Sequence, residues 1–296
     1  LKTALPADIS PIKWLADLLD INETSASRKL KGEIVLKLTE LELILEAYPT
    51  LIDALIPHSV KSNTLVGQYV SFTNEQDIER YLLKVKSVFE EAVAKNFTLY
   101  YFARDLPLLL FFADPILFNY KVAMWCNNVN EEKLKRTNNT LWNIAQEVFE
   151  LYTRTATEEI WYKNLLNNQI FQLEYYASFG KISSEGKAEL LNSFRNIFKQ
   201  ANNWALPGHK ENGPYHLSVS DYALLNNGGL FIKENTPLML MTSLSSVFFP
   251  STNHQETLNR YLTEYNFHKQ RSTSITKVNE RERSTFFYGL EKILTL

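Results

Sequence analysis

Apolar residues recur at helical spacing along most of the stretch from Asn74 to Ala205. In the segment Glu75 to Asn96 they recur every three or four residues, which is the spacing of one helix face. The same spacing predicts further helices over Glu131–Thr153, Glu158–Phe179 and Ser184–Trp204. The aromatic run Phe97–Trp125 is interrupted by Pro107 and Pro115, and we expect short buried helices there. A chain with this pattern buries its core by packing helices, so we expect a mainly α fold.

The composition supports this expectation and excludes several classes of protein. The chain has 296 residues, of which 45% are hydrophobic and 22% charged, so it is neither disordered nor collagen-like nor a disulfide scaffold. Glycine is scarce, with 9 residues against 18 Phe and 15 Tyr, which leaves little room for phosphate-binding loops or a turn-rich all-β fold. The net charge of −2 argues against a protein whose whole surface binds nucleic acid.

The pattern changes after Leu206-Pro-Gly208. Apolar and polar residues alternate over Tyr215–Leu225, Asn226–Gly229 has the composition of a turn, and two short apolar runs follow. We interpret this region as a small antiparallel meander with a hairpin. Helical patterns at His254–Tyr265 and Asn279–Leu294 complete a small C-terminal α+β module.

Near the N-terminus, the spacing of small and apolar residues predicts a helix-turn-helix. Ala16 is the small residue that lets two helices cross, and Asp20, four residues later, tolerates the left-handed backbone that the turn needs. Ile21 fills the gap between the helices, and Ala26 and Leu30 place one face of the second helix on the core. Ser10 and Pro11 mark the start of the first helix.

The opposite face of the second helix carries the polar groups that DNA recognition uses. Hydroxyls and Arg can bind base edges, and Lys and Arg can bind phosphates. The candidate DNA-binding residues are Thr24, Ser25, Ser27, Arg28, Lys29 and Lys31. Residues 1–58 hold nine acidic and six basic residues, so the positive charge is local to this helix. Helix-turn-helix geometry also occurs in proteins that bind other proteins, and a protein-docking unit is therefore the alternative.

The spacing resembles the lambda-repressor-like helix-turn-helix superfamily. The run from Ile21 to Glu33 is similar to a group of transcriptional regulators from Bacteroidetes, in which it typically reads Ile-Ser-x-Asp-Ser-Ala-Tyr-Arg-Arg-Ile-Arg-Gly-Glu. The likeness extends to Arg104–Pro107 and then Pro115, Phe118, Lys121 and Trp125, and to Ser272–Thr276 followed by Glu280, Arg283 and Phe286-Phe287. This chain differs from the group at Thr24 and Ser27 on the presumed DNA face, so no target sequence is carried over.

No pattern of catalytic or metal-binding residues emerges from the sequence. The histidines lack metal-ligand spacing, and a single cysteine, Cys126, can form neither an intrachain disulfide nor a structural zinc site. We expect Arg104 and Asp105 to form a buried ion pair that orients the turn at Pro107. We therefore expect no enzyme activity, no cofactor and no metal, although an enzyme in the C-terminal region stays open as an alternative.

The sequence also gives expectations about location. The first residues show no apolar signal-peptide segment, and the lone cysteine fits a reducing cytoplasm. The most apolar stretch, Leu106–Phe112, is far shorter than the ~20 residues that a membrane span requires. We expect a cytoplasmic protein without a membrane partner.

Together these observations predict a transcriptional regulator that binds double-stranded DNA as a homodimer. The expected domains are a helix-turn-helix domain at 1–58, a linker at 59–73, a helical domain at 74–205 and an α+β module at 206–296. Whether the last two form one unit is left open. This C-terminal region would serve dimerisation or the sensing of a small-molecule or protein effector. The aromatic segment Phe97–Trp125 is a candidate effector pocket, but we favour it as structural core.

Overall fold

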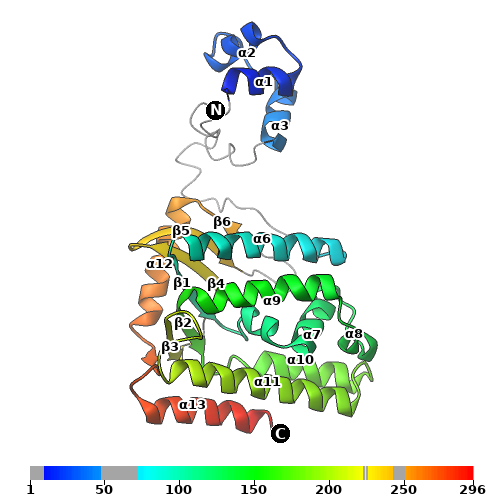
Figure 1. Cartoon of the computed structure of the whole chain (residues 1–296), viewed down its shortest axis with the longest axis vertical. Helices are drawn as coiled ribbons and strands as arrows, with labels where there is room; N and C mark the ends of the chain where they lie inside the picture. The colour runs from blue at the N-terminus through cyan, green and yellow to red at the C-terminus, as the bar shows by residue number, and fades with distance from the viewer. Residues whose placement is uncertain (1–9, 48–71, 223, 225, 243–250, 296) are drawn as a thin grey trace. The chain divides into compact units, whose positions relative to one another are not determined.

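The computed structural model describes residues 10–47, 72–222, 224, 226–242 and 251–295. The chain divides into two compact units, Leu1–Val66 and Gly67–Leu296 (Figure 1). The linker expected at residues 59–73 lies outside the described residues, apart from its last two. Among the helices of the described residues, none is both long and apolar enough to cross a membrane.

The N-terminal unit contains three short helices around a small core. They are α1 (Pro11–Leu19), α2 (Glu23–Leu30) and α3 (Leu38–Ala47). Ser10 is the N-cap residue of α1 and Pro11 opens the helix, as the sequence predicts. Asp20 ends α1 with φ 50° and ψ 49°, which confirms the left-handed turn residue. The buried residues of this core are Leu15, Ala16, Ala26 and Ile44.

The C-terminal unit is built on a mixed sheet of seven strands in the order β6-β5-β4-β1-β2-β3-β7. The strands are β1 (Thr98–Ala103), β2 (Ala156–Tyr162), β3 (Tyr215–Ser220), β4 (Gly228–Lys233), β5 (Thr236–Thr242), β6 (Ser251–Thr252) and β7 (Thr273–Ser274). The central strands β1, β2 and β3 are parallel, while β4, β5, β6 and β7 extend the sheet by antiparallel pairing. Helical crossovers separate the parallel strands in the chain, as parallel pairing requires.

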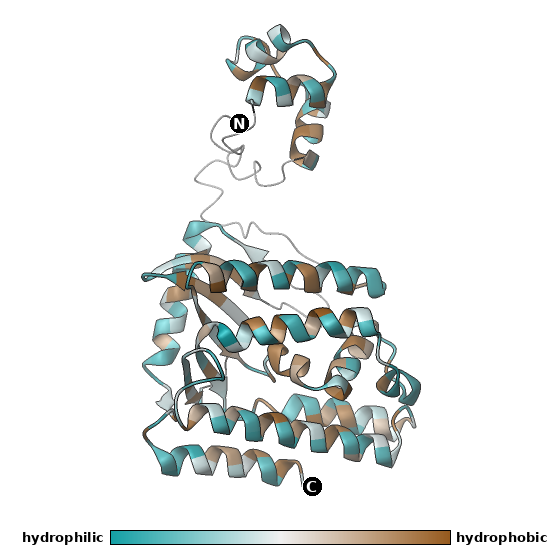
Figure 2. Ribbon diagram, in the orientation of Figure 1, coloured by the Kyte–Doolittle hydropathy of each residue, from teal (hydrophilic) through white to brown (hydrophobic). Residues whose placement is uncertain are grey.

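Helices cover both faces of this sheet. They are α6 (Glu75–Ala94), η2 (Leu108–Ala113), α7 (Pro115–Trp125), α8 (Glu131–Lys135), α9 (Asn139–Arg154), α10 (Asn167–Ser178), α11 (Ser184–Ala205), α12 (Gln255–Lys269) and α13 (Glu280–Ile293). In Figure 1, the helices α6, α9, α11 and α13 run roughly side by side, one below the other. The main core lies between them and the sheet. Helix α12 packs through Tyr265 against Phe102 on the other face. Figure 2 shows that α6 and α9 carry hydrophobic and hydrophilic residues along their length, as half-buried helices do.

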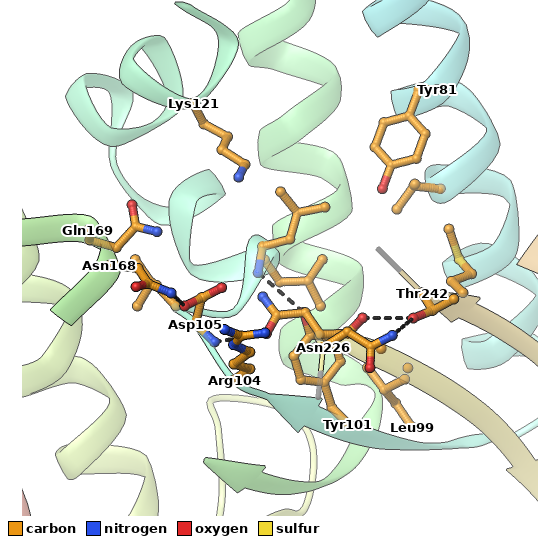
Figure 3. A pocket seen from close by; sticks show the side chains of 18 of the residues that line it. Tyr81, Leu99, Tyr101, Arg104, Asp105, Lys121, Asn168, Gln169, Asn226 and Thr242 are labelled. Atoms are coloured by element: carbon orange, nitrogen blue, oxygen red, sulfur yellow. Dashed lines mark hydrogen bonds between the residues drawn. The ribbon is translucent and has the colours of Figure 1, made fainter. Parts of the chain in front are cut away.

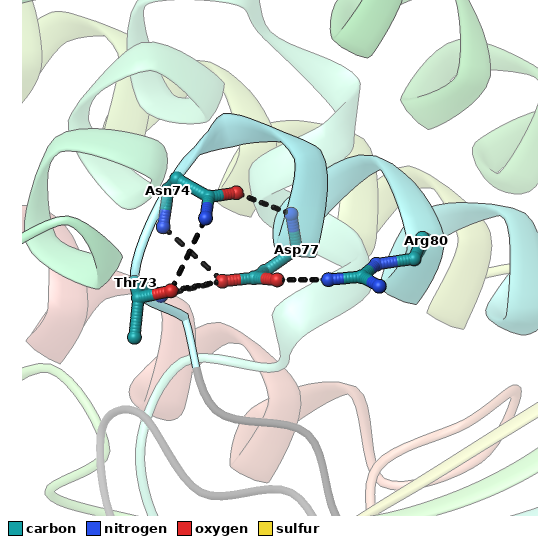
Figure 4. Close-up of polar contacts among 4 residues, drawn as sticks. All are labelled: Thr73, Asn74, Asp77 and Arg80. Carbon is teal, nitrogen blue, oxygen red and sulfur yellow. Dashed lines mark hydrogen bonds and ion pairs between the residues drawn. The ribbon is translucent and has the colours of Figure 1, made fainter.

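Helix α6 begins at a complete capping box (Figure 4). The backbone N–H of Asp77 donates to Asn74 Oδ1 at 3.0 Å, and the Asp77 carboxylate accepts from the Asn74 backbone N–H at 3.2 Å. Asp77 also accepts hydrogen bonds from the Thr73 hydroxyl and from Arg80. These bonds satisfy backbone N–H groups that the first helical turn leaves free, so the start of α6 is fixed.

The expectation of a mainly α fold with a small antiparallel module at its C-terminus is wrong. Strands β1 and β2 come from the stretch in which the sequence pattern predicts helices, and together with β3 they form the centre of the sheet. The physical reason for β1 is that a strand buried on both faces reads as a continuous apolar run instead of an alternation. Its sequence, Thr-Leu-Tyr-Tyr-Phe-Ala, is rich in the aromatic residues that strands favour.

The misassignment of β2 has a different cause. Its two acids, Glu158 and Glu159, follow Thr157 in the manner of a helix start. In the strand they point to opposite faces. Glu159 is 1% exposed and accepts hydrogen bonds from Tyr152 Oη at 2.6 Å and Trp161 Nε1 at 2.7 Å. A central strand can hold a carboxylate only because these donors satisfy it.

The hairpin turn also lies elsewhere than predicted. Strand β3 pairs with β2 and strand β4 with β1, so residues Asn226–Gly229 do not join neighbouring strands. The hairpin connects β4 to β5 through Glu234 and Asn235, which have φ values of 49° and 68°, as two-residue hairpin turns require. Gly229 lies inside β4, where a Cβ atom would lie 2.9 Å from Leu99 Cδ1, so the glycine permits close packing.

Candidate functional site

The outer face of α2 carries the side chains that the sequence identifies for DNA recognition. Ala26 is the buried residue of this helix and defines its inner face. Residues two positions before and after it are rotated by about 200°, so Thr24 and Arg28 point away from the core. Both are exposed, as is Lys31, while Ser25 and Ser27 are partly exposed. The structure thus brings five of the six candidate residues to one accessible surface.

The start of α2 and the charge of Arg28 are both held by local contacts. Asn22 is the N-cap residue, and its Oδ1 accepts a hydrogen bond from the Ser25 backbone N–H at 2.8 Å. Arg28 Nε lies 3.4 Å from Glu33 Oε2, with both side chains about half exposed. An exposed pair of this kind contributes little to stability, so Arg28 can exchange Glu33 for another anion at small cost.

Lys29 lies on a different side of α2. Its side chain is 8% exposed, and its Nζ donates to Glu40 Oε2 at 2.7 Å and to the Val35 carbonyl at 3.3 Å. The hydrogen bond from Lys29 Nζ to the Glu40 carboxylate is the main reason that the pKa of Glu40 is lowered. Lys29 therefore ties α2 to the segment leading into α3 and is occupied by structural contacts.

A cavity of about 370 Å³ lies in the C-terminal unit beyond the carboxyl end of β1 (Figure 3). Phe102 near the end of β1 is opposite Gly228 at the start of β4, and Gly228 is opposite Thr242 at the end of β5. Arg104 and Asp105 follow β1 directly and line the same cavity. In open sheets with parallel strands, ligands bind outside the carboxyl ends of those strands, which is where this cavity lies.

The cavity has an apolar wall and a polar wall. The apolar wall is formed by Val85 and Phe89 of α6, Leu99 of β1, Phe231 of β4 and Met241 of β5. The polar wall comes from the loops, α7 and α10, and includes Asp105, Lys121, Asn168, Gln169, Gln172 and Asn226. Figure 3 shows Lys121, Gln169, Asn168 and Asp105 on one side of the space and Tyr81 and Thr242 on the other. Its volume is in the range of small-molecule sites.

Hydrogen bonds between loops fix the polar end of the cavity. The Asp105 backbone N–H donates to Asn227 Oδ1 at 2.9 Å, and Asn168 Nδ2 donates to Asp105 Oδ1 at 2.5 Å. The Thr242 hydroxyl donates to the Asn227 carbonyl at 3.0 Å. The ends of β1 and β5 and the start of α10 are thereby connected. Arg104 is exposed and Asp105 is only partly buried, so the two residues do not form the buried pair that we expected, and Asp105 accepts a hydrogen bond from the neutral amide of Asn168.

Lys121 enters this cavity from α7. Its Nζ lies 5.0 Å from the ring centroid of Phe111 and 5.7 Å from that of Trp125, within the range of cation–π contacts. Burial lowers the pKa of Lys121 to about 8, and the charge of Asp105 opposes this shift. Among the described residues, the ammonium has no hydrogen-bond acceptor, so its contacts with protein are to aromatic faces alone.

Two glutamines of α10, one turn apart, complete the polar wall. Gln169 is 5% exposed, and both Gln169 Oε1 and Gln172 Oε1 are buried without a hydrogen-bond partner among the described residues. A buried amide without a partner costs free energy, because it loses its bonds to water. Lys121 and these amides are therefore three polar groups that face one cavity with unused hydrogen-bonding capacity.

Sequence reasoning identified part of this site. For the segment Phe97–Trp125 we favour structural core over a pocket, and it supplies both: many of its residues are buried in the core, while Tyr101, Asp105, Lys121 and Met124 line the cavity. The amides of α10 carry no sequence signal, since Gln169 looks like any polar helical residue until the fold places it inside. In the part of the chain that the structure describes, no cluster of three or more His, Cys, Asp or Glu could hold a metal ion.

Cys126 lies at the end of α7, half-buried, and burial raises the pKa of its thiol, which makes it a poor nucleophile. The two regions with functional potential are thus the outer face of α2 and the cavity at the carboxyl end of β1. No protein-family model matches this chain, and neither the curated proteins nor the solved structures gave a match to it.

Proposed function

We propose that this protein is a sequence-specific DNA-binding transcriptional regulator in which α2 enters the major groove. The observation that carries the proposal is the exposed face of α2, where Thr24, Arg28 and Lys31 point away from the core. Arg28 would contact a base edge, since its planar guanidinium fits the acceptors of guanine. Lys31 and the hydroxyls of Ser25 and Ser27 would contact phosphates and adjacent bases.

In this proposal the protein acts as a homodimer. One short recognition helix makes few base contacts, and useful affinity normally requires two half-sites. The C-terminal unit would provide dimerisation or sensing, in the cytoplasm where the DNA lies. Helix α10 exposes Phe171, Tyr175 and Phe179 at four-residue spacing, with exposed fractions of 70%, 59% and 65%. Such an aromatic stripe is the kind of surface that a second copy would cover.

The experiment that tests the proposal is selection of binding sites from a random pool of duplex DNA with the full chain, followed by affinity measurements across a salt series. We expect one enriched sequence with two half-sites, and an affinity that falls steeply as salt rises. The double variant Arg28→Ala/Lys31→Ala should weaken binding at least about tenfold and make the salt dependence shallower. Sedimentation should show two copies of the chain on each DNA duplex.

A matched control removes the same charge elsewhere. The double variant Lys13→Ala/Lys37→Ala deletes two exposed lysines outside α2 and should still select the same sequence. The proposal fails if the full chain shows no salt-dependent binding, or if both double variants lose affinity equally. In the first case, the outer face of α2 would be assigned to protein docking, the alternative for a helix-turn-helix.

A further inference from the structure

The cavity in the C-terminal unit contains a cation that the protein does not satisfy. The Lys121 ammonium has three N–H groups and contacts the faces of Phe111 and Trp125, but no acceptor among the described residues. Aromatic faces offset part of its desolvation and leave its hydrogen-bonding capacity unused. With its pKa at about 8, Lys121 is mostly protonated at neutral pH. An anion entering the cavity would find this ammonium ready to donate.

The cavity also contains neutral groups with free hydrogen-bonding capacity beside that cation. Gln169 is nine-tenths or more buried and lines the same cavity, and its Oε1 has no hydrogen-bond partner among the described residues; the Nε2 of the same amide is the atom that can donate to an anion. Its neighbour Gln172 also presents an unpartnered amide oxygen. Figure 3 shows Lys121 and Gln169 on the same side of the space. Two independent observations thus indicate a binding site.

The rest of the lining sets the size and character of the ligand. Phe89, Leu99, Phe231 and Met241 form a continuous apolar surface across from the polar wall. Among the described residues, the charged groups that line the cavity are Arg104, Asp105 and Lys121, which sum to one positive charge, so a monoanion balances the charge of these groups. A doubly charged phosphate would exceed this charge and would leave the apolar wall uncovered.

We propose that this cavity binds a small organic carboxylate with an apolar body, its carboxylate accepting hydrogen bonds from the Lys121 ammonium and from the Gln169 Nε2 amide and its body packed against Phe89, Leu99 and Phe231. The site uses groups of the C-terminal unit alone, so the inference does not depend on DNA binding by α2. In a regulator, such a ligand would be the effector.

The test is calorimetric titration and thermal denaturation of the full chain with matched probes. Phenylacetate and octanoate carry both parts of the proposed ligand, phenylacetamide and octanamide lack the charge, and acetate lacks the body. We expect at least one of the two apolar carboxylates to bind and to raise the melting temperature, and its uncharged counterpart to bind at least about tenfold more weakly. Acetate and inorganic phosphate should bind more weakly than that carboxylate.

Variants separate binding from folding. Lys121→Met should weaken carboxylate binding at least about tenfold while the unliganded protein melts at the same or a higher temperature, since an unsatisfied ammonium is removed. Gln169→Leu should weaken carboxylate binding by a smaller factor. This variant tests the site without changing Lys121. Lys199→Met, at an exposed position of α11 outside this cavity, should bind as the wild type does.

Several outcomes would each overturn the inference. They are failure of both apolar carboxylates to bind, equal affinity for a carboxylate that binds and for its own amide, and unchanged affinity in Lys121→Met. Tighter binding of inorganic phosphate than of either carboxylate would also overturn it, because the ligand would then be a phosphate without an apolar body.

Discussion

Two lysines of the C-terminal unit point into the protein and differ in what they meet there. Lys210, in the loop after α11, is 3% exposed, and its Nζ donates to the Tyr152 carbonyl at 2.6 Å and to Thr157 Oγ1 at 2.9 Å. The same ammonium lies 3.7 Å from the centroid of the Tyr152 ring. Lys121, on α7, contacts two aromatic rings and faces the cavity.

Glu159, the buried carboxylate whose charge interacts with that of Lys210, also has its hydrogen bonds satisfied. Glu159 accepts hydrogen bonds from Tyr152 Oη and Trp161 Nε1, and the charge of Lys210 offsets its burial. Burial lowers the pKa of Lys210 to about 7 and raises that of Glu159, with each partner opposing the shift of the other. Lys210 is therefore one part of a closed polar cluster whose members satisfy each other.

The difference in hydrogen bonding between Lys210 and Lys121 indicates which of these buried polar groups has a structural role and which a functional one. A cluster that satisfies its own hydrogen bonds specifies the fold, and removing one member leaves the others unpaired. A group that stays unsatisfied lowers stability and gains its partner when a ligand binds. Lys210 belongs to the first kind and Lys121 to the second, although each is an inward-pointing lysine with a lowered pKa.

The largest effect should come from breaking the closed cluster. In Lys210→Met, Thr157 Oγ1 loses the ammonium as donor, the Tyr152 carbonyl keeps only the Thr155 backbone N–H, and Glu159 loses the cation that offsets its charge. We expect the free energy of unfolding at neutral pH to fall by about 3–5 kcal/mol. Urea denaturation followed by tryptophan fluorescence measures it. The control Lys199→Met, at an exposed position of α11, should change the value by less than about 0.5 kcal/mol. A loss below about 1 kcal/mol for Lys210→Met would mean that the cluster is not structural.

The opposite sign is expected for Lys121→Met. The pKa of Lys121 falls from 10.5 to about 8 on folding, so between these pH values the unfolded chain binds more protons and the wild type gains stability as pH rises. The penalty for burying the ammonium is complete below about pH 8 and absent above pH 10.5. Lys121→Met removes it and should stabilise the unliganded protein at neutral pH by on the order of 1 kcal/mol.

Denaturation at several pH values between 7 and 10.5 measures this advantage, which should shrink as pH rises. Carboxylate binding is a second test of the same substitution. Lys121→Met should be more stable than the wild type without ligand, and an added carboxylate should raise its melting temperature less. If Lys121→Met destabilises the protein at every pH, then Lys121 has the same structural role as Lys210 and the contrast between them is lost.

The sequence predicts the local features of this molecule better than its long-range ones. The helices around Ala16 and Asp20, and the long helices α6 and α11, follow from spacing and caps that lie within a few residues. Strands β1 and β2 do not, because their partners lie far away in the chain and supply the burial that makes an apolar run or a Glu-Glu pair into a strand.

The candidate sites divide in the same way. Thr24, Arg28 and Lys31 could be placed on one face from the helical period alone. Lys29 could not be assigned to Glu40, nor Gln169 to the same cavity as Lys121, because those contacts depend on how separate segments pack. The cavity therefore had to be found in the folded chain.

The smallest effect tests the contrast at the start of α6. Asp77 at the start of α6 is satisfied by Thr73, Asn74 and Arg80, and these hydrogen bonds, those from Thr73 first, lower its pKa from 3.8 to about 2 (Figure 4). By the rule drawn from Lys210, it is structural. Asp77→Asn should lower the melting temperature at neutral pH, by less than Lys210→Met does, and should leave carboxylate binding unchanged.

The pH dependence of this effect has a definite sign. Since folding lowers the pKa of Asp77, its contribution to stability is complete above pH 3.8 and is lost as pH falls through about 2. The difference in melting temperature between wild type and Asp77→Asn should therefore narrow over that interval. Glu79→Gln, on the same helix and outside the capping box, is the control and should show a smaller difference at neutral pH. If Asp77→Asn weakens carboxylate binding instead, a satisfied polar group would be contributing to the cavity, and satisfaction alone would no longer separate structural from functional residues.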